Sequence, residues 1–127
     1  MVFPVSRLVV DPERFVDDAL EPLSARGVGA IYTRTSQGMA LRAPLCDSER
    51  QQLIDEFYAP HHEAFARAVA AELKRLGIAL IIDCHSLPSR SLPYELDQNP
   101  DRPDICIGTD SHHTPEWLVT TVAFLLW

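Results

Sequence analysis

The strongest chemical signal in the sequence is a histidine that closely follows an apolar segment. Residues 78–82 read Ile-Ala-Leu-Ile-Ile, and Asp83, Cys84, His85 and Ser86 come next. A continuous apolar run is typical of a strand that helices cover on both faces. Ligands of open α/β sheets bind beyond the carboxyl ends of the strands, so the pattern places His85 where a site would form. A neutral imidazole held there is suited to bind zinc.

Asp83 lies two residues before His85 and, in a strand, on the same face. Its carboxylate is therefore a candidate acceptor for the second ring nitrogen of His85, which metal-bound histidines usually hydrogen-bond to a fixed partner. A histidine that only caps the strand through a hydrogen bond is an equally good interpretation, because one histidine does not make a metal site. Cys84 alternates to the opposite face, which disfavours a Cys–His nucleophile pair.

Arginines and paired histidines are the other candidate site residues. Arginine binds a carboxylate through two parallel hydrogen bonds, so a substrate with two carboxylates would need such residues. Surface arginines in weak ion pairs are the simpler interpretation for most of them. For His61 and His62, packing is favoured over metal binding, because adjacent helical residues point about 100° apart. The arginines in loop-like positions are Arg7, Arg14, Arg34, Arg42, Arg90 and Arg102.

The elements that must position these residues indicate a single α/β domain. The chain has 127 residues, of which 46% are hydrophobic and 23% charged, as in a globular protein. Apolar residues at helical spacing predict a helix from Asp47, an interruption at Pro60 and a second helix that ends at Gly77. A further helix is predicted to begin at Thr114–Pro115.

Three short strands are expected between these helices, at residues 28–32, 78–82 and 104–108. Strands that alternate with helices are typical of βαβ units. The sequence therefore predicts a mixed, mainly parallel sheet flanked by helices.

Charge and motifs exclude several functional classes. With 18 acidic against 11 basic residues and a net charge of -7, nucleic acid and anionic membrane surfaces are disfavoured partners. The apolar segment 117–127 is shorter than the ~20 residues that a membrane-spanning helix needs. The cysteines Cys46, Cys84 and Cys106 fit no zinc or redox spacing, so a reducing cytoplasm is expected. No nucleophile elbow, P-loop or dinucleotide-binding glycine motif occurs.

Four separated segments, taken in order, resemble the N-formylglutamate amidohydrolase family. They are residues 6–15 (SRLVVDPERF), 58–62 (YAPHH), 82–86 (IDCHS) and 102–108 (RPDICIG). The resemblance extends from Ser6 to about Leu118. Four motifs in the right order are a much more specific signal than the Asp-x-His-Ser element alone.

This resemblance implies a zinc-carboxypeptidase-like α/β fold and a zinc-dependent hydrolase. The implied reaction splits the formamide bond of N-formylglutamate, or of a related N-acyl amino acid, to the free amino acid and formate, a step of histidine breakdown. His85 would be the last protein ligand of the zinc and Asp83 its supporting acceptor. Arg14 would help to hold a carboxylate of this small-molecule substrate, with Arg7 close by.

Members of the family are about twice as long, so the resemblance implies that residues 1–127 form one partial domain. The first zinc-binding histidine and its acidic companion are expected on a strand before Met1, and the acid/base glutamate is expected after Trp127, so no catalytic residue is assigned within the chain. The apolar C-terminal segment would need cover or would promote self-association. A non-catalytic dicarboxylate-binding domain and an inactive gene fragment are the alternatives.

Overall fold

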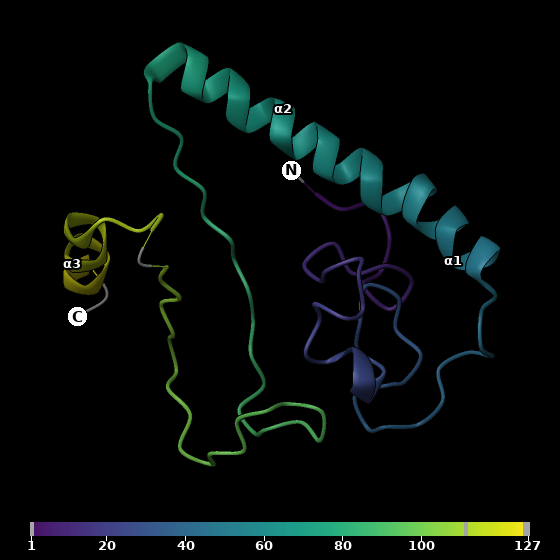
Figure 1. Cartoon of the computed structure of the whole chain (residues 1–127). Helices are drawn as coiled ribbons and strands as arrows, with labels where there is room; N and C mark the ends of the chain where they lie inside the picture. The colour runs from purple at the N-terminus through teal and green to yellow at the C-terminus, as the bar shows by residue number, and fades with distance from the viewer. Residues whose placement is uncertain (1, 111, 126–127) are drawn as a thin grey trace.

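The computed structural model describes residues 2–110 and 112–125 (Figure 1). Helix α1 (Asp47–Leu53), a π-helical segment (Ile54–Tyr58) and helix α2 (Ala59–Leu76) follow one another directly. The irregular N-terminal part of the chain lies against one end of this long helical rod, and an extended segment leads away from the other end. The remaining elements are a 3-10 turn at Ser24–Arg26 and helix α3 (Glu116–Leu125).

Local interactions define both ends of the helical rod. At the start, the Glu49 carboxylate accepts the backbone N–H of Cys46 at 2.8 Å. At the end, Gly77 adopts a left-handed conformation with φ of 73°, and its N–H donates to the carbonyl of Leu73 at 2.8 Å. The predicted end at Gly77 is thus confirmed, because glycine adopts this conformation without steric cost.

The predicted interruption at Pro60 is wrong, because the helical backbone continues through this residue. Proline lacks the N–H that an α-helix needs and its ring crowds the preceding turn. The π-helical segment lies immediately before it, and the wider turn changes which carbonyl each N–H reaches. The helix therefore passes the proline with a local change of pitch.

The predicted mainly parallel sheet is also wrong: the described residues contain no strand and no sheet. Residues 78–82 are extended but pair with no other described segment, and Ile78, Ile81 and Ile82 are 58%, 55% and 75% exposed. Residues 104–108 likewise form no strand. An apolar run indicates that burial of the segment would be favourable. It does not show that partner strands are present, because these must come from other parts of the chain.

The core lies in the N-terminal part of the chain and against the start of the helical rod. Residues 28–32 are buried, but in place of the predicted strand they form a tight turn closed by an isolated bridge between Val28 and Tyr32. Ala30 and Ile31 pack with Ile54 of the π-helical segment. The rod therefore holds the N-terminal loops through its first half.

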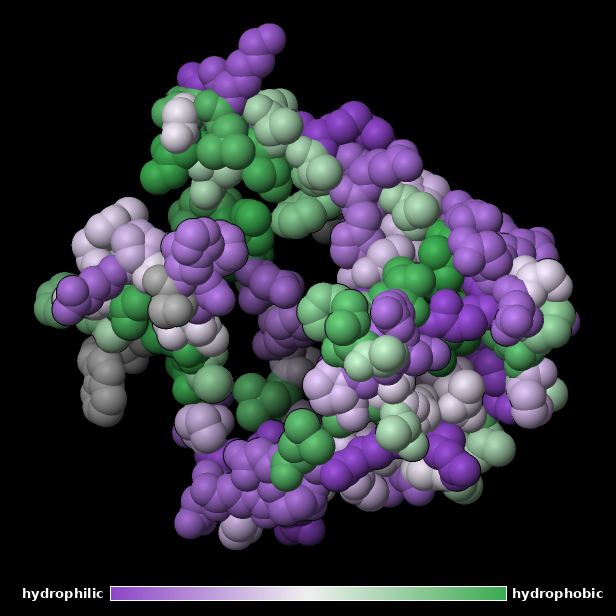
Figure 2. Space-filling model, viewed as in Figure 1, coloured by the Kyte–Doolittle hydropathy of each residue, from purple (hydrophilic) through white to green (hydrophobic). Residues whose placement is uncertain are grey.

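Hydrophobic surface is exposed beyond this core. Figure 2 shows it around the C-terminal end of α2, where Leu73 and Leu76 are 48% and 56% exposed. Among the described residues, no helix combines the length and apolarity that crossing a membrane requires.

Candidate metal centre

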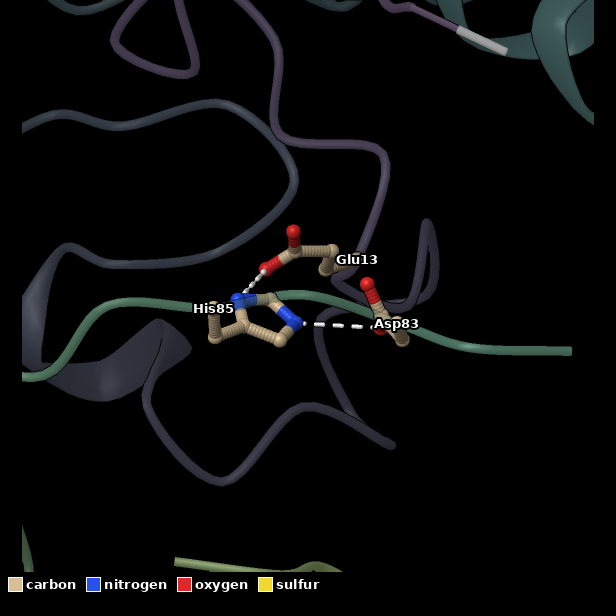
Figure 3. A group of neighbouring side chains, drawn as sticks. All are labelled: Glu13, Asp83 and His85. Atoms are coloured by element: carbon tan, nitrogen blue, oxygen red, sulfur yellow. Dashed lines mark hydrogen bonds and ion pairs between the residues drawn. The ribbon is translucent and has the colours of Figure 1, made fainter. Parts of the chain in front are cut away.

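Glu13, Asp83 and His85 form a cluster that joins the N-terminal loop to the extended segment after α2 (Figure 3). The Nε2 atom of His85 lies 3.0 Å from Oδ2 of Asp83, and its Nδ1 atom lies 3.5 Å from Oε2 of Glu13. One ligand atom from each residue lies within 4.8 Å of the other two. All three side chains are exposed, so the cluster is open to small molecules.

The helical rod fixes the loop that carries Glu13. The Tyr58 hydroxyl donates to the backbone carbonyl of Arg14 at 2.9 Å, and Nε2 of His62 bonds to the carbonyl of Pro12 at 2.9 Å. These two carbonyls stand on either side of Glu13 in the chain. Tyr58 and His62 lie one helical turn apart and their rings also contact each other. The helix therefore holds the backbone of the loop at the residue that faces His85.

A buried carboxylate supports the same loop from within. Asp11 is fully buried and accepts a hydrogen bond from the Tyr32 hydroxyl at 2.8 Å. Burial, together with this hydrogen bond and the Asp11 charge, raises the pKa of Tyr32 to about 12. The guanidinium of Arg7 lies 3.1 Å from Asp11, and that of Arg14 lies 3.7 Å away. Two cations thus share one buried anion, as a charge removed from water requires.

Arg7 connects this buried group to the cluster. Its Nη2 atom donates to Oε2 of Glu13 at 2.5 Å while it also contacts Asp11. Burial alone would lower the pKa of Arg7, but the charges of Asp11, Tyr32 and Glu13 outweigh it and the pKa is raised. A continuous series of polar contacts therefore runs from Asp11 through Arg7 and Glu13 to His85.

Arg14 occupies the other side of Asp11. Its Nη1 atom lies 3.5 Å from Oε1 of Glu21, and its buried Nε atom has no hydrogen-bond partner within the part of the chain that the structure describes. A buried donor without an acceptor is unusual in folded proteins. This Nε atom faces Oδ2 of Asp11 at 3.7 Å, so Arg14 belongs to the buried group of charges around Asp11.

A surface hollow of about 320 Å³ adjoins the cluster. Arg7, Glu13 and His85 all contribute to its wall, so a ligand in it would meet an imidazole, a carboxylate and a guanidinium together. The other lining residues are Phe3, Val5, Asp11, Pro12, Cys84 and Ser86.

The structure places the predicted site residues close together, with one exception and one addition. His85, Asp83 and Arg7 lie in or beside the cluster, whereas Arg14 lies on the far side of Asp11. Glu13 was not predicted. The signal for it was its place inside the Asp11–Arg14 element, which the sequence analysis used only for its arginine.

The histidine pairs lie outside the cluster. The His61 ring packs edge-on against Phe3, and burial, followed by the neighbouring His62, lowers the pKa of His61. His113 bonds to Asp110 at 2.9 Å on the exposed surface. Packing and local hydrogen bonds therefore account for these imidazoles.

Comparisons with known proteins agree on one family. Residues 1–125 match the family model described as N-formylglutamate amidohydrolase. The chain is also 32% identical over 114 residues to an N-formylglutamate deformylase of Pseudomonas aeruginosa. That match covers 84% of this chain and 40% of the relative, so the chain spans less than half of the relative's length. No solved structure matches the chain significantly.

Proposed function

Because the chain belongs to the N-formylglutamate amidohydrolase family, we propose that it acts in hydrolysis of the formamide bond of N-formylglutamate or a related N-acyl amino acid. The products are the free amino acid and formate. The observation that carries the proposal is His85, which stands between two carboxylates and beside an arginine at an open hollow. Metal, substrate and water can all reach such a position.

The residues of the cluster fit zinc by their chemistry. One imidazole and two carboxylates lie within 4.8 Å of one another, and both are donor types that zinc accepts. We propose His85 as the metal ligand and Asp83 as the group that fixes its tautomer, because the Asp83 carboxylate can only accept the Nε2 proton. When bound, zinc would polarise the formyl oxygen and lower the pKa of a bound water.

The arginines supply the substrate-binding part of the proposal. N-formylglutamate carries two carboxylates, and guanidinium groups bind carboxylates in a fixed geometry. We propose that Arg14 helps to hold one carboxylate, with Arg7, which lines the hollow, close to the reacting group. Both arginines would orient the substrate so that its formyl group faces His85.

Formate release from N-formylglutamate by the purified 127-residue chain, with and without added zinc, tests the activity. Bound metal is measured in parallel. His85→Ala should lose both zinc and formate release. His113→Ala is the matched control, because His113 also pairs with a carboxylate but lies on the exposed surface away from the cluster. Equal stoichiometric zinc in the wild type and in His85→Ala would exclude His85 as a ligand.

A non-catalytic dicarboxylate-binding domain is the second candidate. The observation that favours it is the presence of both arginines together with a single histidine in the cluster. Titration calorimetry with N-formylglutamate separates the two: binding without zinc and without formate release supports the binding domain. An inactive fragment would bind neither.

Two further properties belong to the proposal. We place the chain in the cytoplasm because Cys46, Cys84 and Cys106 are free, exposed thiols, which persist in reducing compartments.

We also propose that it self-associates through the apolar C-terminal segment, because Trp117 and Phe124 in α3 are 61% and 81% exposed.

A further inference from the structure

The two ring nitrogens of His85 face two different carboxylates. Because a carboxylate only accepts hydrogen bonds, the 3.0 Å contact with Asp83 places the proton of a neutral imidazole on Nε2. The Nδ1 atom then presents its lone pair to the Glu13 carboxylate at 3.5 Å. In this tautomer two lone pairs face each other and repel, unless a proton or a metal cation lies between them.

The distances from His85 to Asp83 and to Glu13 also indicate two different interactions. A separation of 3.0 Å is that of a hydrogen bond. Zinc bonds nitrogen and oxygen at about 2.0 to 2.2 Å, so two ligand atoms of a tetrahedral site lie about 3.4 Å apart. The 3.5 Å between Nδ1 of His85 and Oε2 of Glu13 matches this ligand spacing.

We infer that Glu13 is a carboxylate ligand of the metal ion that His85 binds, with the ion between Oε2 of Glu13 and Nδ1 of His85. The inference rests on the proposed function for the presence of the metal. It adds a ligand from the N-terminal loop that the sequence analysis did not assign. Asp83 then acts on the opposite nitrogen of the same ring.

Arg7 supports this role of Glu13. A carboxylate oxygen has two lone pairs, so Oε2 can accept the hydrogen bond from Arg7 and bind a cation at the same time. Ligating carboxylates are usually hydrogen-bonded by a second residue, which fixes their orientation. Arg7 is itself fixed by the buried Asp11.

The backbone around Glu13 is held before any metal arrives. Tyr58 and His62 bond to the carbonyls on either side of it, and both belong to the helical rod. A ligand that is already in place binds with less loss of conformational entropy than one on a free loop. The loop of residues 12–14 therefore presents Glu13 to the extended segment that carries His85.

Zinc titration of the full chain, with cobalt as a spectroscopic substitute, tests the inference. We expect Glu13→Gln to weaken zinc binding by about tenfold or more and to change the visible absorption of the cobalt-loaded protein. Glutamine keeps an oxygen for Arg7 but removes the anionic ligand. Glu63→Gln is the matched control, because Glu63 also pairs with an arginine, Arg67, but lies outside the cluster on α2.

The outcomes separate this inference from the function on which it rests. If His85→Ala abolishes zinc binding while Glu13→Gln keeps wild-type affinity and the wild-type cobalt spectrum, Glu13 is not a ligand and only this inference fails. If the wild-type chain binds no zinc, the inference and the proposed metal both fail. Circular dichroism of each variant confirms that the helices are retained.

Discussion

Asp11 is the residue on which the geometry of the N-terminal loop depends. It is the only carboxylate that contacts Tyr32, Arg7 and Arg14 among the described residues. Its burial could not be predicted from the sequence, because an aspartate between Val10 and Pro12 is usually a surface residue. The Asp-x-x-Arg pattern indicated binding chemistry, but the structure gives Asp11 itself a supporting role.

The Tyr32 phenol provides a pH-dependent measure of this buried group. Its folded pKa of about 12 exceeds the ordinary value of 10.0, so the unfolded chain loses the proton first as the pH rises. The stabilisation is complete below pH 10 and is lost as the pH rises towards 12, by about 2 to 3 kcal/mol for a shift of this size. Ultraviolet titration should show a tyrosine step near pH 12, and urea unfolding should show the loss of stability.

Tyr32→Phe should remove that high-pH step and flatten the stability curve between these values. Tyr94→Phe is the control, because the Tyr94 phenol bonds to no carboxylate in the described ranges. A step near pH 12 that survives in Tyr32→Phe would contradict the assignment.

Among the elements, the helices are those that the sequence predicted best. Helical periodicity, the glycine at the end of α2 and the Thr114–Pro115 start of α3 are local signals, and each corresponds to an observed helix. The passage through Pro60 was missed because a π-helical turn has no clear sequence signature.

Replacement of Gly77 tests how strongly the end of α2 is defined. Gly77→Ala should cost about 1 kcal/mol, because an L-residue is disfavoured at a φ of 73° even though the space beside it is open. Thermal melting followed by helical ellipticity measures the loss. Gly108→Ala is the matched control, because Gly108 also has open space but no positive φ. Equal melting temperatures of the two variants would show that the left-handed conformation of Gly77 does not contribute to the stability of α2.

At the scale of the whole molecule, we expect self-association through apolar surface that lies far from the core. The extended residues 78–82 expose isoleucine and leucine side chains without backbone partners in the described structure. An unpaired apolar segment is a template for association. Phe124 in α3 adds a second exposed site.

Charged substitutions at these surfaces should reduce self-association. Ile82→Lys and Phe124→Lys each replace a largely exposed side chain, so they should favour the monomer in sedimentation velocity without loss of helical content. Ala70→Lys, at an exposed position of α2, adds the same charge outside the apolar surfaces. Association that is unchanged in both variants would argue against these surfaces as the cause.

The contact between Asp83 and His85 was more predictable than the fold. His85 and Asp83 could be singled out because their two-residue spacing brings the side chains together in any extended chain, with or without a sheet. The sheet could not be established, since strand pairing depends on segments distant in sequence. Glu13 was missed for the same reason: its approach to His85 spans more than seventy residues, and short-range periodicity carries no information on such contacts.

The π-helical segment at Ile54–Tyr58 has a consequence for sequence variation. Its wider turn holds about one residue more than an α-helical turn, so it takes up one residue without changing the face that the following helix presents. Deletion of one residue here would therefore restore an ordinary α-helix and keep His62 close to the carbonyl of Pro12. A one-residue deletion in α2 just before His62 would instead turn His62 by about 100°. We therefore expect the loss of one residue to be tolerated better within Ile54–Tyr58 than just after it.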